Sequence, residues 1–495
     1  MIRDIYQNIV QEQEVRKHLI ALRKELKEGA NKKAFLYQLG GDYTLLYKLL
    51  EDDDAKIRKN IALIMGELAV PEFMAPLYAA YQKEDKLFVK SDYLTAIRQF
   101  DYHGLLQAFK ERLAFLTNQV FEETSIKHID EEIRILTDML LKVEKPKMHQ
   151  FCGYEQLSDL ILLTNRDHKE VTLSQIKHGQ SKVFNAGVVV KTRDLREIMS
   201  IRTYSEILFH LKNAGVVEDN PKSAAATLCE GGVLDFLNER HKGNSPYYFR
   251  IEIKSKMPLD KKSAFAKKLG SEIERLSERA LINSTSNYEL EIRLIENKEG
   301  LFNVLIKLYT IEDERFKYRK GAVAASITPV NAALVAALSK EYLKDGGQVL
   351  DPFCGVGTML IERNKLVPAK PMYGLDTFGE AIDKAIVNAK IDDTVIHFIN
   401  RDFFDFKHDY LFDEIITNMP AQIGRKTAGE IEHLYHQFFK KALEVLKDEA
   451  IIVMYTRNRE WVVENVSNKK EYTVLKEYEI SRKEEAYVYI IQVRK

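Results

Sequence analysis

The sequence predicts a multidomain protein with a helical N-terminal region, an α+β middle region and a C-terminal α/β domain of the nucleotide-binding type. Residues 349–362 pass from an apolar run through a turn with two glycines into apolar residues at helical spacing. Between residues 247 and 308, strand-like alternation surrounds one amphipathic helix, and before about residue 145 the pattern is helical almost throughout. We expect domains at 1–145, 150–315 and 316–495.

The N-terminal region contains two similar segments, at 46–68 and 77–97. Each has a helix, an acidic turn and a basic residue that opens a second helix. This outline resembles a HEAT repeat, in which stacked helix pairs bury the apolar faces that neither helix can bury alone. A plain helical bundle is the alternative. Pro146 and the change of pattern after it indicate a boundary near residue 145.

In the middle region we expect strands at 187–190, 247–253, 290–294 and 302–308 and a helix at 261–276, with 198–211 either strand or helix. The most basic short stretch lies here and includes Lys254, Lys256, Lys261 and Lys262. It is either a surface that contacts phosphates or a solvated helix face.

Polar residues follow four strands of the C-terminal domain. Gly355 and Gly357 lie in the first loop, and Asp376, Asp402 and Asn418 end or follow the next three strands. Glycines let backbone approach a ligand, and the helix beginning at Thr358 offers unpaired N–H groups. Four consecutive polar strand ends predict a site. A further helix should begin after Thr328 or Ser326, with Pro329 in its first turn.

Composition narrows the class of protein. The 495 residues carry 74 basic and 74 acidic side chains, a balance that neither favours nor excludes nucleic acid. No signal peptide and no twenty-residue apolar stretch are evident, so we expect a cytoplasmic protein without membrane attachment. Cys152, Cys229 and Cys354 are too far apart for a disulfide framework, and the pair His433/His436 lacks neighbouring acids at ligand spacing, so no metal is expected.

The motifs Asp351-Pro352-Phe353-Cys354-Gly355-Val356-Gly357-Thr358, Tyr373-Gly374-Leu375-Asp376 and Asn418-Met419-Pro420-Ala421 resemble class I S-adenosylmethionine-dependent methyltransferases. Within that class the chain resembles the RNA guanine-N2 methyltransferases that carry a THUMP domain and a UPF0020-like catalytic domain. The resemblance covers the last third of the chain well and the middle third loosely. It implies a Rossmann-like catalytic domain after a ferredoxin-like piece and a THUMP domain, which grips the acceptor end of tRNA. Ala421 departs from the family, where an aromatic residue is usual.

The resemblance also implies roles for individual residues. S-adenosylmethionine would be the cofactor, with Thr328 at the helix that caps its pocket. The loop from Asp351 through Phe353, Cys354, Gly355 and Gly357 to Thr358 would hold the methionine and ribose side. Asp376 would accept the ribose hydroxyls, and Asp402 with Phe403 would bracket the adenine. Each acid could instead be a helix cap or turn residue.

Asn418 would hold the target amine together with the backbone carbonyl of Met419, directly before Pro420, as family members do. With Ala421 in place of the aromatic residue, either Phe403 or Tyr455 stacks on the base, or activity is weak, or the target binds differently. The expected RNA contacts are Lys254, Lys256, Lys261, Lys262, Lys317 and Arg319.

The leading hypothesis is therefore a methyltransferase acting on guanine N2 of tRNA. A second hypothesis is a factor that binds RNA or protein and has lost turnover, in which the N-terminal helices would hold a protein partner. A third is a methyltransferase for another amine, in rRNA, DNA, protein or a small molecule.

Overall fold

A computed structural model describes residues 2–119, 121–144, 148–243, 246–422, 427–467 and 469–495. The chain separates into two compact units, Met1–Met148 with Ile282–Tyr288, and His149–Leu281 with Glu289–Lys495. The predicted boundary near residue 145 lies at 145–147, outside the described residues, and the division into three domains stays a prediction. In the described part of the chain, no helix has the length and apolar character that crossing a bilayer requires.

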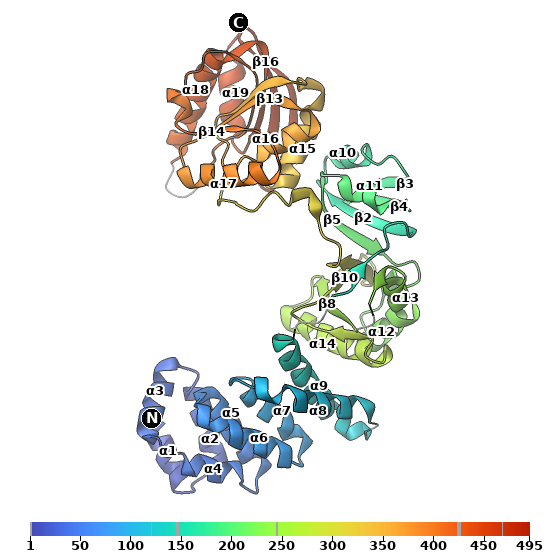
Figure 1. Ribbon diagram of the computed structural model, residues 1–495, viewed down its shortest axis with the longest axis vertical. Helices are drawn as coiled ribbons and strands as arrows, with labels where there is room; N and C mark the ends of the chain where they lie inside the picture. The colour runs from blue at the N-terminus through green and yellow to red at the C-terminus, as the bar shows by residue number, and fades with distance from the viewer. Residues whose placement is uncertain (1, 120, 145–147, 244–245, 423–426, 468) are drawn as a thin grey trace. The chain divides into compact units, whose positions relative to one another are not determined.

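The first unit is helical, as predicted (Figure 1). Helices α5 and α7 pack so closely that a Cβ on Gly66 would lie 2.6 Å from the Cα of Ala96, so this crossing requires glycine. Helix α5 also contacts α2, and α7 contacts α9, which forms a stack of helices. The bounds are α1 (Ile2–Val10), α2 (Val15–Glu25), α3 (Gly29–Leu39), α4 (Thr44–Leu50), α5 (Ala55–Leu68), α6 (Met74–Lys83), α7 (Leu87–Ile97), α8 (Leu106–Asn118) and α9 (Glu123–Val143).

An ion pair joins the two similar segments of this unit. Arg58, near the start of α5, donates to the buried carboxylate of Glu84 in the acidic turn before α7, with Nη2 2.7 Å from Oε1. The same guanidinium donates to the backbone carbonyl of Asp52. The acidic turn and the basic helix start therefore bind each other across neighbouring helix pairs. Such pairing suits a HEAT-like stack, which stays a prediction.

The middle region forms a mixed sheet along the path β3-β4-β2-β5-β11-β10-β8, with β6 paired to β11. The predicted strands and the helix at 261–276 are confirmed, and 198–211 contains the end of α11 followed by β5. The bounds are β1 (Gln150–Phe151), β2 (Ser158–Thr164), α10 (Lys169–Leu173), β3 (Gln180–Phe184), β4 (Gly187–Thr192), α11 (Leu195–Ser200), β5 (Tyr204–His210), β6 (Val216–Val217), α12 (Pro221–Glu230), α13 (Val233–Asn238), β7 (His241–Lys242), β8 (Tyr247–Lys254), α14 (Leu259–Leu276), β9 (Leu281–Asn283), β10 (Leu290–Glu296) and β11 (Phe302–Leu308).

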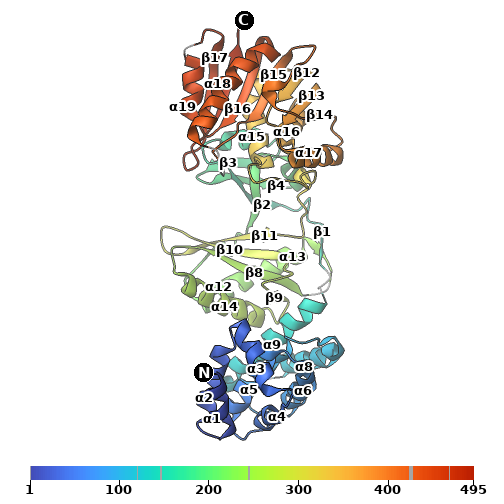
Figure 2. The same ribbon diagram turned by 90° about the vertical axis from the view of Figure 1, so that its left-hand side faces the viewer.

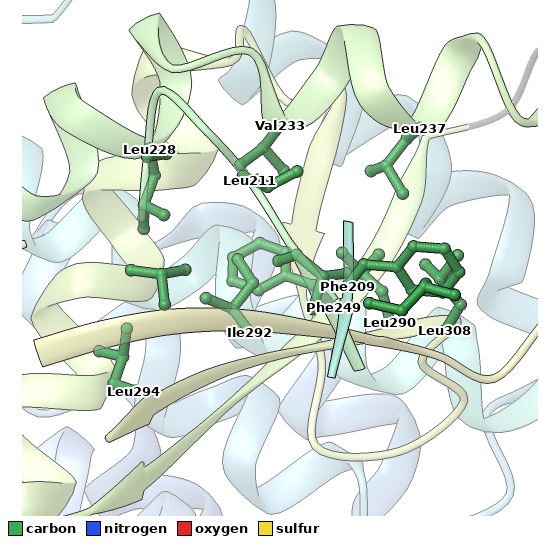
Figure 3. Close-up of a cluster of buried hydrophobic side chains, with 14 of the residues drawn as sticks. Phe209, Leu211, Leu228, Val233, Leu237, Phe249, Leu290, Ile292, Leu294 and Leu308 are labelled. Carbon is green, nitrogen blue, oxygen red and sulfur yellow. The ribbon is translucent and has the colours of Figure 1, made fainter. Parts of the chain in front are cut away.

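Helices α12 and α13 were not predicted, although Asn220 and Pro221 are a typical helix start. The Asn220 side chain accepts hydrogen bonds from the backbone N–H groups of Lys222 and Ser223, and Pro221 occupies the first turn. Figure 3 shows side chains of these helices above the sheet residues that they cover. The cluster includes Leu228, Val233 and Leu237 from the helices and Phe249, Leu290, Ile292 and Leu294 from the strands. The THUMP and ferredoxin-like assignments stay predictions.

The C-terminal region is a seven-stranded sheet in the order β14-β13-β12-β15-β16-β18-β17. Strands β14 to β16 are parallel, and β18 runs antiparallel to β16 and β17. The bounds are α15 (Pro329–Ser339), β12 (Gly347–Asp351), α16 (Thr358–Leu366), β13 (Ala369–Asp376), α17 (Gly379–Ile391), β14 (His397–Asn400), β15 (Phe412–Asn418), α18 (Ala428–Val445), β16 (Leu446–Thr456), α19 (Arg459–Ser467), β17 (Tyr472–Ser481) and β18 (Ala486–Val493).

Both faces of this sheet are covered, which makes three layers (Figure 2). Successive strand residues point to opposite faces, so Leu350 packs with α18 whereas Val349 packs with α15 and α16. The predicted α/β class is confirmed. Strand order reverses at β12, which has β13 on one side and β15 on the other. Ligands of such sheets bind beyond the carboxyl ends of the strands at this switch point.

Hydrogen bonds to Glu362 of α16 join the C-terminal region to the middle region and to the chain segment between them. Glu362 of α16 is buried and accepts two 2.7 Å hydrogen bonds from Arg202, at Nε and Nη2. The Tyr318 hydroxyl donates to the same carboxylate at 2.6 Å. Charge-assisted bidentate pairs of this kind set orientation. The chain that follows Tyr318 is therefore held at a defined position beside α16.

Candidate functional site

A cavity of about 570 Å³ lies where the parallel strands of the C-terminal region end. The predicted strand-end residues are brought together there, and most of the predicted site residues line it. These are Thr328, Asp351, Phe353, Cys354, Gly355, Thr358, Asp376, Asp402, Phe403, Asn418, Met419 and Pro420. Thr328 also caps α15, because its side chain accepts a hydrogen bond from the backbone N–H of Asn331.

The two glycines of the first loop have different roles. Gly355 has φ of +53° and open space where a Cβ would lie, so the backbone there is accessible to a ligand. Gly357 has φ of +81°, and a Cβ would come within 2.9 Å of the Phe398 ring. Gly357 is not among the residues that line the cavity. Gly357 contributes to the turn and to packing against β14, and its role as a cofactor contact stays a prediction.

Asp376 ends β13 and lines the cavity while it also holds the glycine loop. Its Oδ2 accepts from the backbone N–H of Gly355 at 2.9 Å, and its Oδ1 accepts from Phe378 N–H at 2.9 Å. Each carboxylate oxygen can accept a further hydrogen bond. Asp376 can therefore position the loop and bind hydroxyl groups of a ligand at the same time.

Asp351 is the buried acid of the cavity. Its Oδ1 accepts from the Thr417 hydroxyl at 2.6 Å and from Phe353 N–H at 3.1 Å. Its Oδ2 is buried and has no hydrogen-bond partner among the described residues. Burial raises the pKa of Asp351 to about 7, and the charge of Asp376 acts in the same direction. An unpartnered buried oxygen can be completed by a ligand, by a water molecule or by the carboxyl's own proton.

Asp402 and Phe403 lie at the β14 end of the cavity. Asp402 caps a short helical turn by accepting from Phe404 N–H at 2.9 Å, so the turn interpretation holds although the residue also lines the cavity. Phe403 is buried and packs edge-on against Phe353 with ring centroids 6.0 Å apart. Cys354 is also buried, which raises the pKa of its thiol well above its ordinary value and keeps it neutral.

Asn418 is oriented by the segment that precedes α15. Its Nδ2 donates to the backbone carbonyl of Ala325 at 3.4 Å. The Met419 N–H donates to the carbonyl of Tyr455 at 2.9 Å, which holds the chain directly after β15 against β16. The bond at Nδ2 fixes the side-chain amide, and its Oδ1 can then accept a hydrogen bond from a ligand in the cavity.

Ala421 lines the same cavity, at the position where the resemblance leads us to expect an aromatic side chain. The two aromatic residues that could replace that side chain, Phe403 and Tyr455, line the cavity as well. Both therefore remain candidates for stacking on a base.

Sequence reasoning missed the residue that holds one wall of the cavity. Residues 323–328 line it, and Asn388 of α17, which is fully buried, anchors the chain before them. Asn388 Oδ1 accepts from the N–H groups of Lys320 and Gly321 at 3.1 and 3.0 Å, and its Nδ2 donates to the Gly321 carbonyl. The sequence could have indicated Asn388, because it is a polar residue on the apolar face of α17, at helical spacing from Ala381 and Ala385.

Arg319 lies in the segment that precedes this wall. Its guanidinium is directed into the domain, with Nη1 3.2 Å from Thr358 Oγ1 and Nε 3.0 Å from the Gly321 carbonyl. These donors bind within the C-terminal region, and a contact of Arg319 with RNA stays a prediction. Lys317 is exposed and pairs with Glu312 at 3.1 Å and with Glu314.

Three of the four predicted lysines of the middle region line an open groove of about 1320 Å³. Lys254, Lys256 and Lys262 line it together with Lys298, whereas Lys261 lies outside the lining. Glu252 and Glu296 line it too, and Lys254 Nζ is 2.5 Å from Glu252. The groove is therefore basic but not exclusively so.

The expectation that the pair His433/His436 lacks neighbouring acids at metal-ligand spacing is wrong. His436 does have acids at ligand spacing, because Glu432 lies one turn earlier on α18 and Glu464 lies on α19. The ligand atoms of these three residues lie within 4.8 Å of one another. His436 Nδ1 is already 2.8 Å from Asn465 Oδ1, and the cluster is partly exposed.

Residues 317–485 match the family model described as RMKL-like, methyltransferase domain (UPF0020). The C-terminal part of this chain is a methyltransferase domain. Over 136 residues the chain is 32% identical to the tRNA (guanine(10)-N2)-dimethyltransferase of Methanothermobacter thermautotrophicus, covering 26% of this chain and 38% of that protein. Over 218 residues it is 25% identical to the tRNA (guanine(6)-N2)-methyltransferase of Archaeoglobus fulgidus, covering 38% and 54%. The chain thus spans about half or less of the length of these relatives.

Among solved structures, TrmN from Thermus thermophilus has the same fold over 68% of this chain and 99% of its own, with a TM-score of 0.53 and 16% identity. The matched domain has a class I methyltransferase-like α/β fold, and the match to a methyltransferase family indicates S-adenosylmethionine as its cofactor. The cavity fits that molecule. The buried, unpaired Oδ2 of Asp351 suits a cationic group, and S-adenosylmethionine carries both an ammonium and a sulfonium.

The raised pKa of Asp351 predicts how cofactor binding depends on pH. Below pH 7 the carboxyl is mostly protonated and neutral, and above pH 7 it is a carboxylate that attracts a cation. Affinity for S-adenosylmethionine should therefore rise from about pH 6 to about pH 7.5, by up to about tenfold. Calorimetry at several pH values measures this rise. Asp351→Asn should bind more weakly and show little change with pH, and an equal pH dependence in the two proteins would contradict the assignment.

Proposed function

We propose that this protein methylates RNA, transferring a methyl group to N2 of guanine in tRNA. The observation that carries the proposal is the position of Asn418, which lines the same cavity as the cofactor loop and whose Oδ1 has no hydrogen-bond partner among the described residues. Two relatives that are named as tRNA guanine-N2 methyltransferases support the choice of substrate. The Asn-Met-Pro sequence at the end of β15 agrees with the motif of such enzymes.

In this proposal the residues mainly position and polarise the reactants. S-adenosylmethionine supplies an electrophilic methyl group on its sulfonium. Asn418 Oδ1 and the Met419 carbonyl accept hydrogen bonds from the target amine, which directs its lone pair toward the methyl group and stabilises the positive charge that develops on nitrogen. The wall at 323–328 and the buried aromatic Phe403 limit the access of water.

The groove beside α14 would hold the RNA backbone. Lys254, Lys256 and Lys262 supply positive charge on its sides, and a wide open groove suits a flexible polyanion. The THUMP-like character proposed for the middle region agrees with binding near the acceptor end of tRNA. Lys261 and Lys317 stay proposed as outer contacts.

Removing groove charges should weaken RNA binding without affecting the cofactor. Lys256→Ala and Lys262→Ala together should lower affinity for unmodified tRNA and reduce the slope of log affinity against log salt by about one for each phosphate that is no longer neutralised. Filter binding at several salt concentrations measures both quantities. Lys268→Ala, on the same helix as Lys262 but outside the groove lining, is the control. Equal effects in the control and the double variant would show that the groove is not the binding surface.

The decisive experiment compares the nucleosides of tRNA from cells with and without the gene by mass spectrometry. We expect loss of N2-methylguanosine at a defined position and its restoration by purified protein. Loss of a different methylated nucleoside would replace the proposed substrate. Because Ala421 stands where an aromatic residue is usual, the second candidate is a binding factor without turnover. That candidate predicts unchanged nucleosides together with retained cofactor and RNA binding.

A further inference from the structure

The cavity has two halves, which follow the order of the strands. Asp376 ends β13 and Gly355 follows β12, so the half above β12 and β13 holds the cofactor loop. Asn418 ends β15, and Tyr455 lies beside it in register on β16. The half above β15 and β16 therefore remains for the acceptor, next to the residue that would hold the amine.

A donor and an acceptor of opposite charge lie in that half. Arg457 follows the end of β16, and Glu484 lies in the turn between β17 and β18. Both line the cavity that contains Asn418, and Arg457 Nη2 is 2.7 Å from Glu484 Oε2. About half of each side chain is exposed, 47% and 53%, so both retain hydrogen-bonding capacity toward a ligand.

We propose that Arg457 and Glu484 select guanine, with the Glu484 carboxylate accepting from N1–H and the Arg457 guanidinium donating to O6. This inference rests on the proposed function, in which Asn418 holds N2. Three bases carry an exocyclic amine, and the groups next to that amine distinguish them. In guanine the amine is followed by a ring N–H donor and then a carbonyl acceptor. In adenine and cytosine the neighbouring ring nitrogen is an acceptor, which leaves a carboxylate unpaired.

The pair can be tested by exchanging its charges. The double variant R457E/E484R preserves an ion pair but places a donor opposite N1–H and an acceptor opposite O6. A half-exposed ion pair contributes little to the free energy of unfolding, so the variant should fold. The matched control is the exchange R459E/E477R, because Arg459 and Glu477 form an ion pair of the same length, 2.7 Å, outside the cavity lining.

Initial rates of methyl transfer to unmodified tRNA at limiting RNA give kcat/KM, and calorimetry gives the affinity for S-adenosylmethionine. We expect R457E/E484R to lower kcat/KM by about 10- to 100-fold, as for the loss of a good base contact, with cofactor affinity unchanged. The control exchange should remain within about twofold of the wild type. Glu484→Ala provides a second variant and should also lower kcat/KM by about tenfold or more.

The outcomes separate this inference from the function on which it rests. If R457E/E484R and Glu484→Ala methylate guanine as well as the wild type does, the selection of guanine by this pair is overturned and the proposed function stands. A loss that the control exchange shares, or that follows loss of cofactor affinity, also overturns it. If the wild type transfers no methyl group to guanine N2, the proposed function fails and this inference fails with it.

Discussion

Replacing Asn418 by alanine should lower the rate of methyl transfer by about 10²–10³. Asn418 supplies a preorganised acceptor at the end of β15, and its orientation is set before the RNA arrives because Nδ2 is bound to the Ala325 carbonyl. Without that acceptor, the target amine loses the hydrogen bond that strengthens as positive charge develops on nitrogen. The loss should therefore appear in the chemical step.

Single-turnover rates with saturating enzyme measure this step on the RNA that proves to be the substrate. The affinity of Asn418→Ala for S-adenosylmethionine, from calorimetry, is the internal control and should stay close to that of the wild type. Full single-turnover activity in Asn418→Ala would exclude this role. A parallel loss of cofactor affinity would instead mean that the residue stabilises the cavity as a whole.

Replacing Asp376 by alanine should weaken S-adenosylmethionine binding by about 10- to 100-fold. A hydrogen bond to a charged acceptor contributes about 1.5–3 kcal/mol, and the carboxylate is expected to accept from the ribose hydroxyls. The same substitution removes the acceptor of the Gly355 N–H, so the glycine loop loses one of its anchors. Both effects weaken cofactor binding, and neither acts directly on RNA binding.

Calorimetric titration of Asp376→Ala against the wild type tests this prediction, with tRNA affinity measured in parallel and expected to be unchanged. Asp383→Ala is the matched control, because Asp383 is an exposed acid on α17 outside the cavity lining. Asp376→Asn keeps an acceptor oxygen without the charge, so its affinity for S-adenosylmethionine should lie between those of the wild type and Asp376→Ala. Unaltered cofactor affinity in Asp376→Ala would refute its assignment to the ribose.

Much of the site could be predicted from the sequence because its parts are local. The strand, glycine loop and helix around Gly355 are contiguous, and both Asp376 and Asn418 end strands that their own apolar patterns predict. A helix cap at Thr328 or Ser326 was predicted for the same reason, since an N-cap and the proline after it are close in the chain, and the structure has Thr328 as the cap. Parallel strands end at one edge of a sheet, so these positions had to converge.

Residues whose partners are distant in the sequence could not be assigned in this way. Arg319 was expected to contact RNA, and the sequence could not show that its guanidinium also binds Thr358, which lies 39 residues away. Asn388 supports the cavity wall through Gly321, which lies 67 residues earlier. A charged or polar residue has no periodic signature of its own, so only the folded chain shows whether it faces solvent or a partner.

The sequence by itself determined the α/β class of the last third, the positions of its strand ends and the place of the glycine loop, because hydrophobic periodicity and turn residues act over a few residues. Only the tertiary structure decided which side chains meet across the sheet. Arg457 and Glu484 become partners because β16 pairs with β18, whose turn with β17 brings Glu484 back to the cavity from 27 residues further along the chain. That pairing depends on the register of antiparallel strands, which is set by packing across the whole sheet.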